Sequence, residues 1–244
     1  DNDIVYYAGT AGSENKTAYI SADLQFEGSG FIFNVGEGAD TIDVDMSGTI
    51  TDDQGGGRDL SKNWGGTLRL SATNNMYDEC LINAGTLVIT SDGALGDNDV
   101  KIGNDATDGT LEYVGPGEVI NNQIRVGNNN TNINHTGAGS ILNNGSGVLT
   151  FSQGTFNENR DAVTAARTVT LGGISDIVVS GTIRNNGGGS TAVGITKSGT
   201  NTVTHNGNNT YTGDTAVNAG RLVLSGRHAS VILLGPGVGS AADL

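Results

Sequence analysis

Apolar and polar residues alternate along most of the chain in short runs. Examples lie at residues 42–46, 100–102, 111–113, 148–151 and 168–171. Alternation with a period of two over about four to six residues predicts half-buried β-strands. Glycine, asparagine and aspartate separate the runs, and these residue types form turns because they tolerate left-handed backbone or bond to their own chain. No segment has a sustained helical pattern of apolar residues, so the sequence predicts an all-β fold.

One passage of this alternating chain occurs twice, at about residues 46–90 and 179–226. Each copy begins with S-G-T-I, continues through a glycine run to a lysine, and ends with N-A-G before an apolar strand. Repeated strand-and-turn units are typical of stacks in which each unit buries its apolar face on its neighbours. The expected structural turn positions of the two copies are Gly66, Tyr77, Asn83, Gly85, Gly199, Tyr211, Asn218 and Gly220.

A chain of short strands could form a sandwich, a barrel, a propeller or a parallel β-helix. The serial order of strand and turn units, the small and β-branched strand residues, and the asparagines at turns favour the β-helix. We therefore predict one domain over residues 1–244, a single-stranded parallel β-helix (β-solenoid). At about 20 residues per coil and about 4.8 Å per rung, it would have roughly eleven or twelve rungs.

Composition narrows the possible partners. The chain has 40 glycines among 244 residues and only 5% aromatic residues, which suits a narrow aliphatic core. Its net charge is −14 with only 12 lysines and arginines, whereas nucleic acids and anionic lipids require clustered basic residues. We expect neither partner. No apolar stretch approaches 18 residues, so the sequence predicts no transmembrane segment.

Location is indicated by the cysteine content and the first residue. The single cysteine, Cys80, cannot form an internal disulfide, and its apolar neighbours predict a buried, unreactive thiol. The chain starts at Asp1 rather than at a methionine, as a cleaved export signal would leave it. We expect a secreted protein that is found outside the cell or at the cell surface.

Candidate chemistry in the sequence is sparse. Asp43 and Asp45 share one strand face with Asp40 nearby, but their alternation with apolar residues predicts an outward, solvated face rather than a catalytic carboxylate pair. The histidines, among them His205 and His228, show neither metal-ligand spacing nor an acid partner. His205 takes the place that a leucine has in the first copy. We expect no catalytic residues, no metal site, no cofactor and no enzymatic activity.

The repeated passage resembles a known family. The string K-N-W-G-G-T-L-R-L from Lys62, followed by N-A-G-T-L from Asn83, is similar to the autotransporter-associated β-strand repeat, also called the passenger-associated transport repeat. The string N-N-T-Y-T-G-D-T-A-V-N-A-G from Asn208 resembles the core of that repeat more closely, whereas the first copy departs from it at residues 76–80. The resemblance implies an exported, β-helical bacterial protein in which the repeat is structural, and it implies no activity.

A stack of coils has two open ends, and no amphipathic helix is expected to cap either of them. The apolar residues expected at these ends, as assembly surfaces, are Ile4, Val5, Tyr6, Val231, Ile232 and Leu233. Contacts between unlike ends that do not close into a ring propagate. The sequence therefore predicts a structural subunit that assembles end to end with other copies into a surface filament or fibre. The alternatives are an adhesin passenger fragment that binds a surface glycan or host protein and, more remotely, a polysaccharide-active enzyme.

Overall fold

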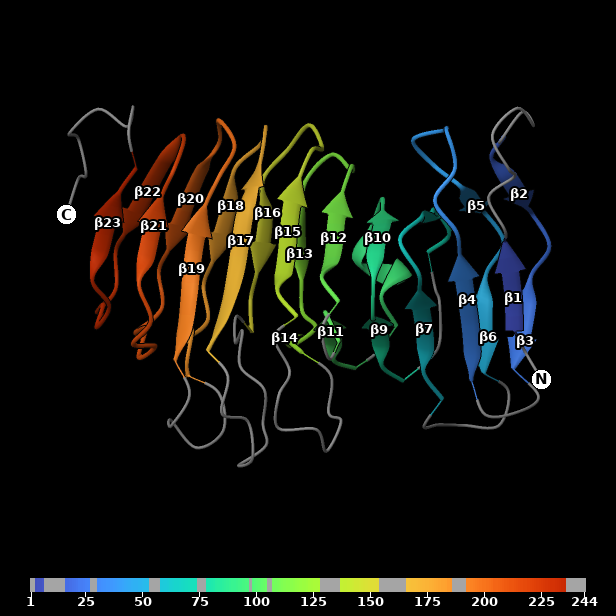
Figure 1. The fold of residues 1–244 in the computed structure, drawn as a ribbon, viewed down its shortest axis with the longest axis horizontal. Coiled ribbons are helices and arrows are strands. Elements are labelled where there is room, and N and C mark those ends of the chain that lie inside the picture. Colours follow the sequence, from blue (N-terminus) through green and yellow to red (C-terminus); the bar gives the residue numbers. More distant parts are fainter. Residues whose placement is uncertain are drawn as a thin grey trace.

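The protein is a parallel β-solenoid in the computed structural model, which describes residues 3–6, 16–26, 30–52, 58–73, 78–96, 98–104, 107–127, 137–153, 166–185 and 192–235. Successive strands stack side by side along the long axis, from the first laps to the last (Figure 1). All pairs between the described strands are parallel, as a β-helix requires, so the predicted fold class is confirmed.

Four sheets form the faces of the solenoid. The six-stranded sheet holds β1 (Asp3–Tyr6), β4 (Phe31–Val35), β7 (Leu60–Asn63), β9 (Cys80–Ile82), β11 (Val100–Ile102) and β14 (Ile124–Val126). The ten-stranded sheet holds β2 (Ala18–Ile20), β5 (Val44–Met46), β8 (Thr67–Leu70), β10 (Gly85–Ile89), β12 (Gly109–Tyr113), β15 (Gly139–Asn143), β17 (Arg167–Gly173), β19 (Val193–Lys197), β21 (Thr215–Val217) and β23 (Ile232–Leu234). The five-stranded sheet holds β13 (Glu118–Ile120), β16 (Leu149–Phe151), β18 (Ile177–Val179), β20 (Thr202–His205) and β22 (Arg221–Leu224). The two-stranded sheet pairs β3 (Leu24–Phe26) with β6 (Ile50–Asp52).

The number of residues per lap varies, but inward-facing residues of successive strands still pair with one another. Leu68 pairs with Leu87, 19 residues later, whereas Leu111 pairs with Ile141, 30 residues later. The ten-stranded sheet runs along the whole described solenoid, so this part has ten laps. Several laps exceed the length of about 20 residues from which eleven or twelve rungs were predicted for the whole chain.

The core is a narrow stack of aliphatic columns, because alternate residues of each strand point inward. One inward column of the ten-stranded sheet, fully buried throughout, consists of Val44, Leu68, Leu87, Leu111, Ile141 and Leu171. Each such residue stabilises the fold by about 1.5–3 kcal/mol through burial. Cys80 is also fully buried, as predicted.

Helix is nearly absent from the part of the chain that the structure describes. The one helical element there is a 3-10 turn, η1 (Asp92–Ala94). No helix among the described residues has the length and apolar character needed to cross a membrane.

Candidate functional site

Each copy of the repeat closes one corner of the solenoid with a fully buried lysine. In the first copy Lys62 is the next-to-last residue of β7, at the corner before β8, and its ammonium donates to three backbone carbonyls. The acceptors are Asn63 (3.0 Å), Trp64 (2.8 Å) and Ala84 (3.0 Å). An ammonium has three donors, so these acceptors satisfy it completely. Because Ala84 belongs to the next lap, the lysine joins two consecutive laps.

The second copy repeats this arrangement. Lys197 ends β19 before β20 and is also fully buried. Its ammonium donates to the carbonyls of Ser198, Gly199 (3.0 Å) and Ala219 (3.1 Å). In both copies the acceptors lie one, two and 22 residues after the lysine. Both copies of the repeat therefore hold their lysine with the three backbone carbonyls at the same positions of the repeat. We call this arrangement the lysine corner.

An aspartate of the preceding lap supports each lysine corner. The Thr67 amide donates to Asp43 at 2.7 Å, and the Thr202 amide donates to Asp176 at 2.8 Å. Burial lowers the pKa of Lys62 to about 7, and the negative charge of Asp43 opposes this shift. For Lys197 burial lowers the pKa to about 8, against the same effect from Asp176. The aspartates thus favour the charged form of both lysines.

Left-handed backbone makes these corners possible. Trp64 has φ 64°, and Gly199, which takes the same place in the second copy, has φ 72°. The glycine after N-A has φ 69° at Gly85 and 67° at Gly220. A Cβ added to Gly220 would lie 2.4 Å from the carbonyl oxygen of Asn201, so only glycine fits there without displacement.

The two copies occupy different corners of the solenoid. The first copy connects the six-stranded sheet, through β7 and β9, to the ten-stranded sheet, through β8 and β10. The second copy connects the ten-stranded sheet, through β19 and β21, to the five-stranded sheet, through β20 and β22. In each copy the two laps pair with one another. The repeat therefore specifies a corner and two stacked laps, and it does not specify a face.

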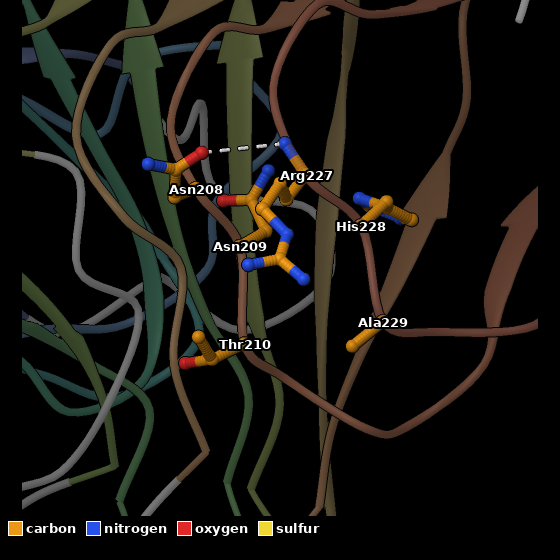
Figure 2. A pocket seen from close by; sticks show the side chains of 6 residues that line it. All are labelled: Asn208, Asn209, Thr210, Arg227, His228 and Ala229. Atoms are coloured by element: carbon orange, nitrogen blue, oxygen red, sulfur yellow. Dashed lines mark hydrogen bonds between the residues drawn. The ribbon is translucent and has the colours of Figure 1, made fainter.

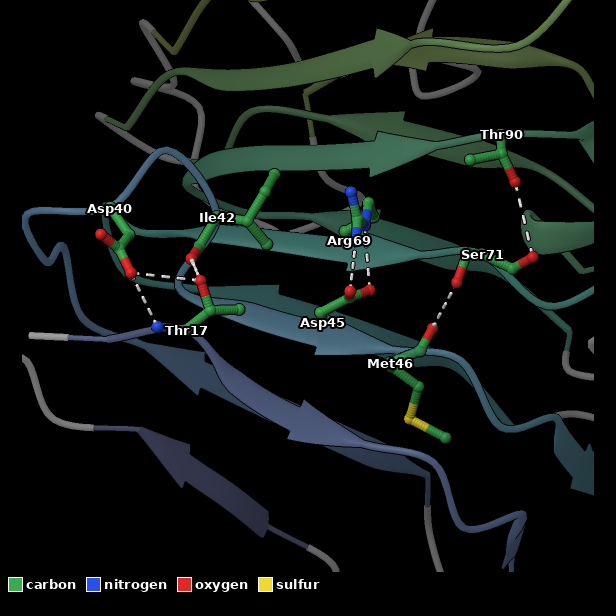
Figure 3. A network of polar contacts seen from close by, with 8 residues as sticks. All are labelled: Thr17, Asp40, Ile42, Asp45, Met46, Arg69, Ser71 and Thr90. Atoms are coloured by element: carbon green, nitrogen blue, oxygen red, sulfur yellow. Dashed lines mark hydrogen bonds and ion pairs between the residues drawn. The ribbon is translucent and has the colours of Figure 1, made fainter.

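The candidate carboxylates have structural partners. Asp45 forms an ion pair with Arg69 on the neighbouring strand, and Asp40 accepts a hydrogen bond from the Thr17 amide at 2.9 Å (Figure 3). Asp43 accepts bonds from two backbone amides, those of Gly38 at 2.7 Å and Thr67. The expected solvated face was wrong for this pair, because Asp43 and Asp45 are only 2% and 7% exposed. The carboxylate oxygens of Asp43 and Asp45 are therefore engaged by hydrogen bonds and an ion pair within the protein.

The other predicted turn residues lie in varied surroundings. Asn83 extends a ladder of amides across three laps, because its side chain donates to Asn63 at 2.8 Å and Asn63 donates to Asn34 at 2.9 Å. Gly66 is buried, and a Cβ there would lie 2.3 Å from the carbonyl of the preceding lap. Asn218 is exposed. Tyr77 lies outside the described residues.

The apolar residues expected at the ends belong to outer strands of the described solenoid. Ile4 and Tyr6 on β1 are half-buried and pack on the core, as does Ile232 on β23. In contrast, Val231 is 60% exposed and Leu233 is 47% exposed. The side chain of Val5 lies outside the described residues. An apolar surface is therefore open beside β23.

The second copy differs from the first by a polar cluster within its core. His205 is fully buried, and neither ring nitrogen has a hydrogen-bond partner among the described residues. Its ring centroid lies 6.1 Å from that of His228, whose Nε2 is 2.7 Å from the hydroxyl of Tyr211. The same hydroxyl lies 2.7 Å from Thr215 Oγ1. Tyr211 was expected at a turn, and its side chain is fully buried.

Desolvation sets the protonation of this cluster. Burial, with a smaller effect from His228, lowers the pKa of His205 to about 3. Burial also lowers the pKa of His228. Both imidazoles are therefore neutral at neutral pH. Across all described residues, no group of three or more His, Cys, Asp or Glu side chains is placed to hold a metal ion.

A small pocket opens beside the polar cluster (Figure 2). Its cavity has a volume of about 360 Å³. The lining residues are Asn208, Asn209, Thr210, Arg227, His228 and Ala229. No sequence motif indicated this pocket, since its residues come from two turns in successive laps.

Comparison with known proteins identifies the repeated corner. A family model described as the passenger-associated transport repeat matches residues 62–89 and 195–224. The chain carries two passenger-associated transport repeats. Both matches coincide with the lysine corners and their stacked laps. The resemblance seen in the sequence is thereby confirmed.

A curated relative is similar over most of the chain. The chain is 28% identical over 254 residues to a protein named "Adhesin BmaC autotransporter" from Brucella suis biovar 1 (strain 1330). The match covers 90% of this chain and 7% of that adhesin, so the chain spans a small part of the relative's length. No solved structure matches. The protein is thus a passenger-type repeat protein distantly related to an autotransporter adhesin, and such repeats imply a secreted or surface location.

Proposed function

We propose that this chain is a rod segment of a bacterial surface adhesin, and that it contacts its partner through the sides of the solenoid. The main support is that both passenger-associated transport repeats are built into one continuous parallel stack, each as two consecutive laps. A stack of this kind is stiff along its axis and exposes long lateral faces. The similarity to an adhesin favours this function over the end-to-end filament.

The ten-stranded sheet offers a suitable lateral face. One outward column of this sheet carries hydroxyl side chains on six consecutive strands. The column consists of Thr67, Thr86, Thr110, Ser140, Thr170 and Thr196. These side chains are half-buried and repeat at the strand spacing of about 4.8 Å. Such a surface can donate and accept hydrogen bonds along an extended glycan or protein, whereas the net charge of −14 disfavours nucleic acid.

We also propose that the chain is not an enzyme. The best carboxylate candidates, Asp43 and Asp45, are engaged by backbone amides and by Arg69. General acid catalysis on a sugar needs a carboxyl group that can reach the glycosidic oxygen. An assay for reducing ends or unsaturated products on acidic and neutral polysaccharides tests this proposal. Turnover that is lost in Asp45→Asn would contradict it.

Binding experiments test the adhesin function directly. Beads coated with the folded chain should adhere to host cells or to immobilised matrix glycans, and beads coated with heat-denatured chain should not. Antibodies against the chain should label intact cells of the bacterium that makes it. Absence of adhesion together with absence of surface labelling would refute the function.

End-to-end assembly remains a second candidate because of the apolar side chains exposed on β23. Leu233 and Leu234 are 47% and 48% exposed, and a further lap stacked on β23 would cover them. That lap could belong to a second copy of the chain. Sedimentation velocity should then show oligomers that grow with concentration and that Leu234→Lys abolishes, because Leu234 follows Val217 in the inward column. A monomer over the whole concentration range would eliminate this candidate.

A further inference from the structure

The pocket beside the second repeat combines one cation with several uncharged hydrogen-bonding groups. Two turns in successive laps form it, one at residues 208–210 and one at residues 227–229. Figure 2 shows the guanidinium of Arg227 in the middle of the lining side chains. The cavity volume of about 360 Å³ lies at the lower end of the range of about 300–1,000 Å³ found for small-molecule sites. A single ring-sized ligand suits this space.

The guanidinium of Arg227 is available to a ligand. Arg69, Lys101 and Arg125 each form an ion pair with a carboxylate, whereas no described carboxylate pairs with Arg227. The pocket lining contains no acidic residue. In a chain with a net charge of −14, an arginine without a carboxylate partner in a concave site is a specific feature. Its planar fork of donors matches a carboxylate bidentately.

The groups around Arg227 are held in place. Asn209 is 3% exposed, and its side-chain oxygen accepts a bond from the Ile183 amide at 2.9 Å. His228 is fixed by Tyr211 through Nε2, while its buried Nδ1 has no partner among the described residues. Exposed amide and hydroxyl groups of the 208–210 turn complete the lining. The pocket can therefore bind hydroxyl groups beside the guanidinium.

The first repeat lacks these features at the equivalent position. Its chain forms the 3-10 turn η1 there, with Asp92 at the place of Arg227. The Asp92 amide donates to the carboxylate of Glu118 at 2.9 Å, so that turn is occupied by the protein's own acid. The pocket is therefore not a general product of the repeat fold. Among the described residues of the first copy, the turn that corresponds to residues 227–229 offers no free cation to a ligand.

We propose that this pocket binds a sugar acid, a monosaccharide unit that carries one carboxylate and several hydroxyl groups. The carboxylate pairs with Arg227, and the hydroxyl groups bond to the exposed side-chain amide of Asn208 and the exposed hydroxyl of Thr210. One cation in a strongly acidic protein suits a single carboxylate better than a polyanion, which the net charge repels. This inference rests on the proposed adhesin function and gives its ligand class.

Ligand titrations followed by saturation-transfer NMR on the full chain test the proposal. The probes are the methyl glycosides of glucuronic acid and N-acetylneuraminic acid. Methyl glucoside, glucose 6-sulfate and acetate serve as comparisons. The variants are Arg227→Gln and, as a control with the same change of charge on an exposed arginine outside the pocket, Arg184→Gln.

We expect saturable binding of at least one sugar acid and at least about tenfold weaker binding of methyl glucoside. Arg227→Gln should lower the affinity for the sugar acid at least about tenfold, and Arg184→Gln should leave that affinity unchanged. Equal binding of neutral and acidic sugars, equal loss in both variants, or no sugar-acid binding would overturn the proposal. Equal affinity for acetate would reduce the pocket to a general carboxylate site and would also overturn it.

Adhesion assays separate this proposal from the adhesin function. If beads coated with Arg227→Gln chain adhere as well as wild-type beads, the adhesin function stands and the pocket is not its ligand site. If wild-type beads do not adhere and intact cells are not labelled, but the purified chain binds the sugar acid, the pocket stands and the adhesin function fails.

Discussion

Replacement of His205 by leucine should stabilise the protein, and the gain should increase as the pH falls. His205 is fully buried, with both ring nitrogens unpartnered among the described residues. Leu70 takes the same place in the first copy and is 1% exposed, so the fold already accommodates leucine there. Removal of a buried polar group without hydrogen bonds should gain about 1–3 kcal/mol at pH 7.5.

The pH dependence follows from the lowered pKa of His205, about 3 in the folded protein. The unfolded chain binds a proton near pH 6.5, whereas the folded chain does not, so wild-type stability falls as the pH drops below 6.5. At pH 5 this linkage removes about 2 kcal/mol from the wild type and nothing from the leucine variant. The stability difference should therefore rise from about 2 kcal/mol at pH 7.5 to about 4 kcal/mol at pH 5.

Urea unfolding followed by circular dichroism at both pH values measures the two differences. The reciprocal variant Leu70→His is the matched control, and it should lose stability at pH 7.5 and lose more at pH 5. A difference for His205→Leu that does not change with pH would refute the assignment of a neutral, unpartnered imidazole. A destabilised His205→Leu variant would refute the packing argument.

Three further predictions concern the corners. Gly220→Ala should lower the free energy of unfolding by about 2 kcal/mol or more because its φ is 67° and its Cβ would meet a carbonyl. The control Gly65→Ala should be near neutral in thermal melts, because its Cβ would make only an ordinary contact, 3.7 Å from a Glu37 carboxylate oxygen. The free energy of unfolding should rise between pH 7 and pH 10, because folded Lys62, with its pKa of about 7, releases its proton before the unfolded chain does. Lys62→Met should reduce that rise by about 3–5 kcal/mol, and an unchanged pH profile would contradict the buried lysine. Asn63→Ala should lower the free energy of unfolding by about 1–2 kcal/mol because it breaks the amide ladder, and the midpoint of unfolding in urea measures this loss.

The solenoid was predictable because its strands are short, alternate with a period of two and recur as a repeated passage. The sequence did not predict which two sheets of the solenoid each copy of the repeat connects. Both copies have the same local pattern, yet one joins the six- and ten-stranded sheets and the other joins the ten- and five-stranded sheets. The repeat fixes only a corner and its two laps, and the lengths of the intervening laps decide which corner that is. Lap lengths depend on turns that carry no periodic signal.

The lysine corners show what the sequence analysis overlooked. Lys62 and Lys197 stand at the same distance before N-A-G in both copies, and this shared spacing was the available signal. Period-two alternation places a charged residue outward, so it could not indicate a lysine buried at a corner. Asp43 and Asp176 lie outside the matched passages, one lap earlier, and their support of the corners depends on strand register. The pocket at Arg227 likewise arises only when two laps stack.

Pulsed electron–electron resonance distances between nitroxide labels test the parallel, in-register stack most directly. Labels replace Thr67, Thr196 and Leu233, which belong to one outward column, and Cys80 is changed to alanine. Five strand steps separate Thr67 from Thr196 and seven separate it from Leu233, which gives about 24 Å and about 34 Å at about 4.8 Å per step. The account predicts that the second distance exceeds the first by about 10 Å. Equal distances, or a broad distribution without this increment, would contradict it.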